Sequence, residues 1–376
     1  MQVLDPEKTA ASGDLSSNPR RPARTGIVID ASCDVAPAFL ASADVAVIPI
    51  PIRIGSTTYI DQHDASATAR YMRENANGEG ATGQSLPLDA AQMSRFFLEH
   101  FALDYDSVYC LTITASRSPI HEAASHGSLL ATSAIRQARQ EKGIARPFQF
   151  RVIDTRNMFA GSGIPAMVLQ DLLRAQVPAK DIRGELQRII DATHTYYVPD
   201  NLGYARARSR VRGDRSISLA SVLLDGALDI KPIVLGRQGD TRPVAKCRGR
   251  ADAWARLFAV AARQVQRGLY APHVIISYAG PLQDLHGSPA LEQLRAACAQ
   301  ENVSLHLLPM SITDDEHRSG RTDLGLRWRE PRHRVLTSAR SGCARAHCYT
   351  FTRRWQHQRV NRACAATLRP QRSAGG

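Results

Sequence analysis

Short apolar runs alternate with amphipathic stretches through the first half of the chain. Residues 26–30 (GIVID), 108–113 (VYCLTI) and 148–154 (FQFRVID) are apolar and bounded by polar turns, which is typical of buried strands. Residues 88–100 repeat apolar side chains at helical spacing. Because most of these strands lead into helices, the pattern predicts an α/β fold whose first domain, residues 26–185, has three α/β/α layers and a mainly parallel sheet.

Proline and glycine interrupt the next apolar run. Residues 45–54 (VAVIPIPIRI) are strongly β-branched, but Pro49 and Pro51 cannot donate to a central ladder. We therefore expect an edge strand or an extended connection there, followed by a hairpin extension over residues 55–61.

The second half of the pattern indicates a separate α+β domain over residues 186–330. A turn at Gly239-Asp240 between two strand-like runs predicts a hairpin. Further apolar periodicity predicts helices at residues 251–267 and 288–300 and strands at residues 273–278 and 303–309. Outside the two domains, we expect a disordered leader at residues 1–25 and a basic, disordered or aberrant tail at residues 331–376.

A hydroxyl-rich turn follows the strand at residues 108–113. It contains Thr114, Ser116 and Ser118, and Pro119 then begins a helix. One interpretation is that Ser118 only caps this helix. The other is an anion site, because a helix N-terminus offers unpaired N–H groups and ligands of open α/β sheets bind at strand ends.

Composition excludes several classes of protein. The chain is 43% hydrophobic and 22% charged, as in ordinary globular proteins. No run approaches the ~20 apolar residues of a membrane span, and the N-terminus lacks the apolar core of a secretory signal. Seven cysteines without paired spacing favour a reduced, cytoplasmic protein, in which Cys110 and Cys298 are small core residues.

The basic charge is concentrated in the tail. Ten of the 13 net positive charges lie in residues 332–376, which contain arginine but no lysine or acid, so residues 1–331 carry only +3. A nucleic-acid-binding arm is one reading of this tail, although we regard nucleic acid as an unlikely partner. A zinc site is another interpretation, with Cys343, His347, Cys348, His357 and Cys364 as candidate ligands, but their spacing fits no standard site. We favour a third interpretation, in which the tail is out-of-frame or degenerate sequence.

Several landmarks occur together in a fixed order. They are DASCD at residues 30–34, TGQS at 82–85, the hydroxyl turn, VIDTRNMFAGSG at 152–163 and DIKPIVLGRQGDTRPVAK at 229–246. This collinear set resembles the DegV family of fatty-acid-binding proteins, whose members include the B subunit of bacterial fatty acid kinase. The resemblance covers roughly residues 26–312.

The resemblance implies a two-domain fold with a long-chain fatty acid between the domains. The acyl chain would lie in an apolar tunnel, and Thr82, Ser118, Arg210 and His317 would meet the carboxylate. The chain departs from the family pattern at the paired glycines before Arg210, which are Arg208 and Ser209 here. It also lacks the Gly-Pro-Gly that follows the family's histidine.

The resemblance further implies a non-catalytic protein that presents the fatty acid to a separate, DAK-like fatty acid kinase subunit. The chain has no Walker loop of its own, and we expect no metal and no cofactor beyond the bound lipid. An alternative is a hydrolase with Ser116 or Ser118 as nucleophile and His121 or His317 as base. The sequence has no G-x-S-x-G elbow to support it.

Overall fold

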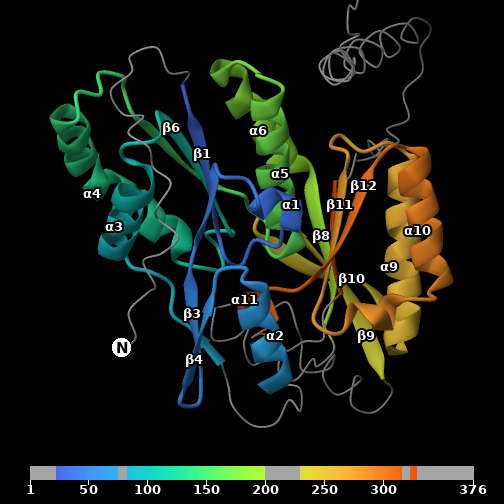
Figure 1. The fold of residues 1–376 in the computed structure, drawn as a ribbon. Coiled ribbons are helices and arrows are strands. Elements are labelled where there is room, and N and C mark those ends of the chain that lie inside the picture. Colours follow the sequence, from blue (N-terminus) through green and yellow to red (C-terminus); the bar gives the residue numbers. More distant parts are fainter. Residues whose placement is uncertain (1–22, 75–82, 200–228, 316–321, 328–376) are drawn as a thin grey trace, which may run out of the picture.

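The computed structural model describes residues 23–74, 83–199, 229–315 and 322–327. Two large sheets lie on either side of a shared helical layer (Figure 1). We call the four-stranded sheet with its covering helices the N-terminal unit, and the six-stranded sheet with its helices the C-terminal unit.

The sheet of the N-terminal unit is entirely parallel. Its order is β2-β1-β6-β7, formed by β2 (Val45–Ile48), β1 (Thr25–Asp30), β6 (Ser107–Thr112) and β7 (Gln149–Asp154). Successive side chains of a strand point to opposite faces. Helices cover both faces here, so the two inner strands, β1 and β6, are buried after their first residue. Strand β1 begins at Thr25, where Arg24 is already fixed to Asp44 and Asp106.

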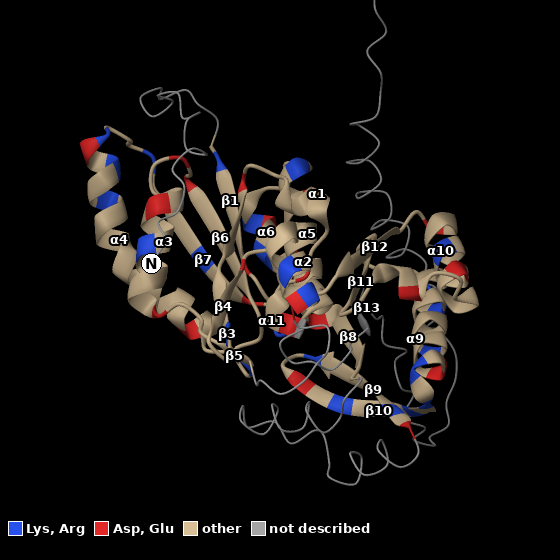
Figure 2. Cartoon of the chain, turned by 60° about the horizontal axis from the view of Figure 1, so that its bottom comes forward, with Lys and Arg blue, Asp and Glu red and all other residues tan. Residues whose placement is uncertain are grey.

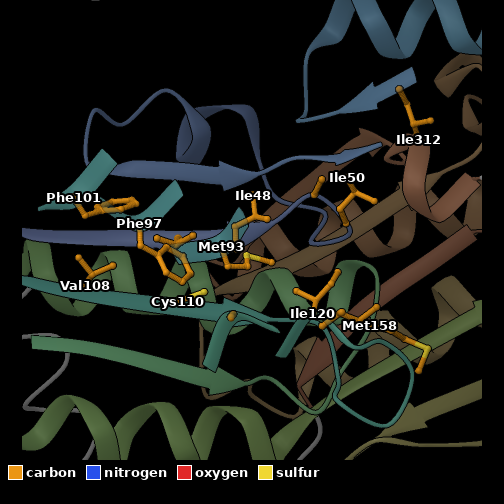
Figure 3. Close-up of a cluster of buried hydrophobic side chains, with 14 of the residues drawn as sticks. Ile48, Ile50, Met93, Phe97, Phe101, Val108, Cys110, Ile120, Met158 and Ile312 are labelled. Carbon is orange, nitrogen blue, oxygen red and sulfur yellow. The ribbon is translucent and has the colours of Figure 1, made fainter. Parts of the chain in front are cut away.

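Helices cover both faces of this sheet. On one face, α3 (Ala90–Phe101) and α4 (Ile120–Glu141) pack against Val28, Val108 and Cys110 (Figure 3). On the other, α1 (Pro37–Leu40), α5 (Ala160–Arg174) and α6 (Ala179–Ala192) pack against the alternate residues, Ile27, Ile29, Tyr109 and Leu111. The observed α/β fold with a parallel sheet confirms the predicted class.

Pro49 divides the β-branched run into two strands. Strand β2 stays at the edge of the parallel sheet, and β3 (Ile50–Ile54) leaves it. A hairpin through Gly55 joins β3 to β4 (Thr57–Asp61), and β5 (Gly83–Ser85) completes a three-stranded antiparallel sheet beside α2 (Ala65–Glu74). The hairpin was predicted, and β2 is an edge strand, one of the two predicted alternatives. Pro51 departs from the prediction, because it lies in β3, the central strand of the three-stranded sheet.

The six-stranded sheet is mixed, in the order β10-β9-β8-β13-β11-β12. Its strands are β8 (Thr193–Val198), β9 (Ile230–Arg237), β10 (Asp240–Arg248), β11 (His273–Tyr278), β12 (Ser304–Pro309) and β13 (Thr322–Arg327). Helices α9 (Gly249–Gln266) and α10 (Pro289–Gln300) cover its outer face, with a short turn, η2 (Leu282–Leu285), between β11 and α10. Figure 2 shows basic and acidic residues interleaved along these two outer helices.

Strand β13 was not predicted. It lies between β8 and β11 and runs antiparallel to both, with Gly325 opposite Thr195 and Ile275. The family resemblance fades near residue 314, and the sequence pattern indicates no strand at these residues, although they lie inside the predicted C-terminal domain of residues 186–330. The structure places a strand there, so the sheet is continuous across its centre.

Helix α5 is the central element of the molecule. It contacts β1 and β6 on one side and β8, β11 and β13 on the other, so five layers alternate as helix, sheet, helix, sheet, helix. The close approach depends on glycine: a Cβ at Gly161 would overlap Thr195 Oγ1, and one at Gly163 would overlap the Asp34 carbonyl. After β12, the chain returns to the N-terminal unit through α11 (Ile312–Asp315), which contacts β3.

Candidate functional site

Three turns at the carboxyl ends of β1, β6 and β7 lie side by side. Parallel strands end at one edge of the sheet, and this edge is where ligands of open α/β sheets bind. A backbone bond joins the turns after β6 and β7, in which Thr114 N donates to Asn157 O at 2.9 Å. The turn after β1 is bonded to the end of β2, where Ala31 N donates to Ile48 O at 3.1 Å.

Asp30 fixes the first two turns to each other. One carboxylate oxygen accepts from Ile113 N at 2.7 Å, and the other accepts from Ser32 N at 3.0 Å and from the Ser32 hydroxyl. The side chain is fully buried, and burial raises its pKa while the bonds to Ser32 and Ile113 oppose the shift. Both oxygens of the Asp30 carboxylate are therefore used to hold the backbone of these two turns in place.

The hydroxyl turn combines three side chains of different accessibility. Thr114 is buried, Ser116 is exposed and Ser118 is half-buried. Thr114 Oγ1 and Ser116 Oγ are 3.1 Å apart, and Ser118 Oγ accepts from Ile120 N at 3.4 Å. The helix begins at Ile120 rather than at Pro119, one residue later than predicted, with Pro119 at its N-cap. Ser118 thus makes one long bond to the first turn.

The β7–α5 turn has an unusual backbone. Arg156 and Phe159 have φ values of 49° and 54°, in the left-handed region that residues other than glycine rarely adopt. The Asn157 side chain holds this shape, because its Nδ2 donates to Thr155 O at 3.3 Å and its Oδ1 accepts from Thr195 Oγ1 at 3.1 Å. Such conformations cost about 1–3 kcal/mol each and concentrate at functional sites.

The hairpin between β9 and β10 reaches from the C-terminal unit onto these turns. Gly239 N donates to Arg156 O at 2.8 Å, and Ser116 Oγ donates to Gly239 O at 2.7 Å. Beside them, Arg117 Nη2 donates to Thr241 Oγ1 at 2.9 Å. The hairpin was predicted from sequence, but its docking on the hydroxyl turn was not.

The segment after β12 also closes on the N-terminal unit. Ser311 N donates to Asp34 Oδ1 at 3.0 Å. Asp61 Oδ2 accepts from Thr313 N at 2.7 Å and from its hydroxyl at 2.6 Å. All four side chains are buried, so these bonds tie the two units together beside the strand ends.

An apolar seam lies next to the hydroxyl turn. Ile120 and Met158, which lie close together in Figure 3, share one buried cluster with Phe159 of the N-terminal unit and with Tyr197 and Val234 of the C-terminal unit. The Phe159 and Tyr197 rings meet edge to face, with centroids 5.6 Å apart. Polar donors and apolar side chains from both units therefore occur together at the junction.

His121 does not act on the serines of the turn. Its Nδ1 is 3.1 Å from Thr112 Oγ1, and Ser116 donates to the Gly239 carbonyl. The ring thus contacts the end of β6. These contacts do not pair His121 with Ser116 or Ser118, the two serines of the hydrolase alternative.

Of the four predicted ligand residues, only Ser118 lies within the described part of the chain. Thr82, Arg210 and His317 lie outside it, as does the tail from residue 328. Sequence reasoning missed Gly239, Thr241 and Ser311, because nothing local to them indicates contact with a distant turn.

In residues 23–74, 83–199, 229–315 and 322–327, no group of three or more His, Cys, Asp or Glu side chains is placed to share a metal ion. Cys33, Cys110, Cys247 and Cys298 are buried free thiols, so Cys110 and Cys298 are core residues as predicted. Within the same ranges, no helix combines the length and apolar character that a bilayer crossing requires.

The sequence profile of the DegV family, a family described as uncharacterised, matches residues 24–314. The chain belongs to the DegV family. DegV domain-containing proteins of Xanthomonas campestris pv. campestris and Xanthomonas axonopodis pv. citri are 38% and 37% identical to it over 290 residues, covering 77% of this chain and 92% of each relative. The resemblance inferred from the motifs is confirmed.

Solved DegV structures share the fold at low sequence identity. A DegV-family protein from Ruminococcus gnavus, described with vaccenic acid, has a TM-score of 0.64 at 18% identity and covers 81% of this chain and 100% of its own. A stearic acid-binding protein from Eubacterium ventriosum has the same score and identity, covering 81% and 97%. DegV from Bacillus subtilis, described as a fatty acid binding protein, has a TM-score of 0.61 at 14% identity, covering 82% and 100%.

Proposed function

We propose that the chain binds a long-chain fatty acid, with the carboxylate at the strand-end turns and the acyl chain along the apolar seam. The observation that carries this proposal is the position of the hydroxyl turn. Ser118 is the half-buried hydroxyl beside Ile120, at the point where both units contribute to the seam. DegV-family structures described with vaccenic and stearic acid support a fatty acid as the ligand.

The chemistry of such a ligand suits this junction. Removing acyl methylenes from water contributes ~0.8 kcal/mol each, so a chain of about sixteen carbons supplies on the order of 10 kcal/mol before entropic costs. A buried carboxylate needs charge-assisted hydrogen bonds. Ser118 would donate one of them, and Thr82, Arg210 and His317 are the further donors that the family resemblance suggests.

The Ser118→Ala variant tests the site. We expect about ten- to a hundredfold weaker binding of oleate, because one hydrogen bond to a charged group is lost, with an unchanged thermal midpoint. The matched control is Ser128→Ala, which removes a hydroxyl that only donates to Ser125 O on the same helix. Equal affinity of the two variants would refute the assignment of Ser118.

The same proposal extends to a partner. We propose that the chain itself is not a catalyst and presents the carboxylate to a separate DAK-like kinase subunit, which transfers phosphate from ATP. Hydroxylamine trapping of the acyl phosphate checks this. Hydroxamate should form only when this chain, fatty acid, ATP and the kinase subunit are combined; product without the kinase would contradict it.

A further inference from the structure

Three hydrogen bonds join the tip of the β9–β10 hairpin to the turns at the strand ends of the N-terminal unit. Ser116 donates to the Gly239 carbonyl, Arg117 donates to the Thr241 hydroxyl, and the Gly239 amide donates to Arg156 O. The residues of the two side-chain bonds lie 123 and 124 positions apart in the chain. Together the three bonds join the tip of the β9–β10 hairpin to the turns after both β6 and β7. The tip is thus held at two points on the turn that contains Ser118 and at one point on the neighbouring β7–α5 turn.

The tip does not accommodate a side chain at Gly239. Gly239 has a φ of +85°, where side-chain-bearing residues are strained, and a Cβ there would lie 3.2 Å from both Ser116 Oγ and Thr114 Oγ1. Glycine is therefore required for the carbonyl of the tip to reach the Ser116 hydroxyl. The neighbouring bond from Arg117 fixes Thr241, two residues further along.

We propose that Ser116, Arg117, Gly239 and Thr241 form a clasp that closes the head-group end of the ligand site and sets how long the ligand is retained. The inference rests on the proposed function. Ser118 adjoins Arg117 directly, so a carboxylate bonded to Ser118 would lie beside the docked tip. Release of the head group then requires the tip to separate from the turn, and ligand dissociation is limited by that opening.

The clasp makes a kinetic prediction. A side-chain hydrogen bond of this kind changes an opening equilibrium by about two- to tenfold when it is removed. Thr241→Val keeps the shape of the side chain but removes the acceptor for Arg117. Ser116→Ala removes the donor to Gly239. We expect each variant to release ligand about two- to tenfold faster, and Gly239→Ala to do so by more than tenfold.

The experiment measures dissociation of a fluorescent long-chain fatty acid from the full chain after addition of excess oleate. Hydrogen exchange of the Gly239 amide in the ligand-free protein is measured in parallel. The matched control is Thr58→Val, an exposed threonine just after the tip of the β3–β4 hairpin. Faster release and faster Gly239 exchange in the clasp variants, with neither change in the control, is the expected result.

Other outcomes separate the clasp from the proposed function. If the unmodified chain binds fatty acid and the clasp variants release it at the unmodified rate, the clasp is refuted while the proposed function stands. If the unmodified chain binds no fatty acid, the proposed function fails. Unaltered Gly239 exchange in the variants would then refute the clasp as well.

Discussion

Three buried aspartates fix the backbone around the candidate site. Asp30 accepts from Ile113 N, Asp34 accepts from Ser311 N, and Asp61 accepts from Thr313 N. Each carboxylate satisfies an amide from a segment far away in sequence, where an unpaired buried amide would cost about 1–3 kcal/mol. The acids therefore act as structural acceptors, and the hydroxyl turn is left as the source of donors.

Asp34 is a buried carboxyl group that accepts from the Ser311 amide. Burial raises its pKa from 3.8 to about 6, while Ser277, His63 and Ser311 N oppose the shift. A carboxyl group with a raised pKa in the folded state contributes stability below pH 3.8. That contribution is lost as the pH rises through about 6. At neutral pH the ionised, buried form is a net cost to folding.

Asp34→Asn should remove that cost. The amide oxygen can still accept from Ser311 N, and no charge is buried. We expect the free energy of unfolding at pH 7.5 to rise by about 1–3 kcal/mol, and the difference from the unmodified protein to shrink as the pH falls to 5. Urea denaturation at the two pH values measures both quantities.

The control for this prediction is Glu301→Gln, which neutralises an exposed carboxyl group at the end of α10. Its effect should be small and similar at both pH values. A gain for Asp34→Asn that is equally large at pH 5 and pH 7.5 would contradict the raised pKa as the cause.

At the scale of elements, helix α5 depends on two glycines. The turn before it is strained at Arg156 and Phe159, and the helix is then pressed between strands of both sheets. Residues from Ala160 to Gln170 are all buried, so the helix has no solvent-facing side over that length. Small residues at its N-terminal end let Thr195 and the Asp34 backbone approach.

Gly161→Ala and Gly163→Ala should each destabilise the protein severely, by about 4 kcal/mol or more, because the new Cβ would overlap fixed atoms. Gly184→Ala is the matched control: this glycine lies inside α6 with no neighbour near its Cβ position. There, alanine should stabilise by up to about 1 kcal/mol. Thermal or urea unfolding compares the three; small effects at Gly161 and Gly163 would contradict the packing of α5.

The local pattern of apolar and polar residues predicted most of these helices and strands. It failed for a strand that forms only by pairing with strands far away in the sequence. The break at Pro49 and the hairpin at Gly239 follow from backbone chemistry that the sequence displays. Strand β13 was missed because its short sequence, TDLGLR, has little apolar character and forms only by insertion between β8 and β11. The start of α4 differs by one residue, a normal error at a helix end.

At the scale of the whole molecule, the two units share α5 and exchange contacts on both sides of the site. The hairpin tip and the segment after β12 both reach from the C-terminal unit, and Asp34 and Asp61 of the N-terminal part of the chain hold the latter. The sequence motifs predicted a site between two units and named Ser118. They did not predict the docked hairpin, because its partners are separated by more than 120 residues and their contact depends on the packing of both sheets.

Native mass spectrometry of the purified chain tests the central claim most directly. The account predicts a bound species heavier than the polypeptide by the mass of one long-chain fatty acid, either as purified or after incubation with oleate or stearate. Denaturation should remove the excess mass and release the free acid. A chain that keeps its bare mass after incubation with saturated and unsaturated fatty acids, while remaining folded, would contradict the account.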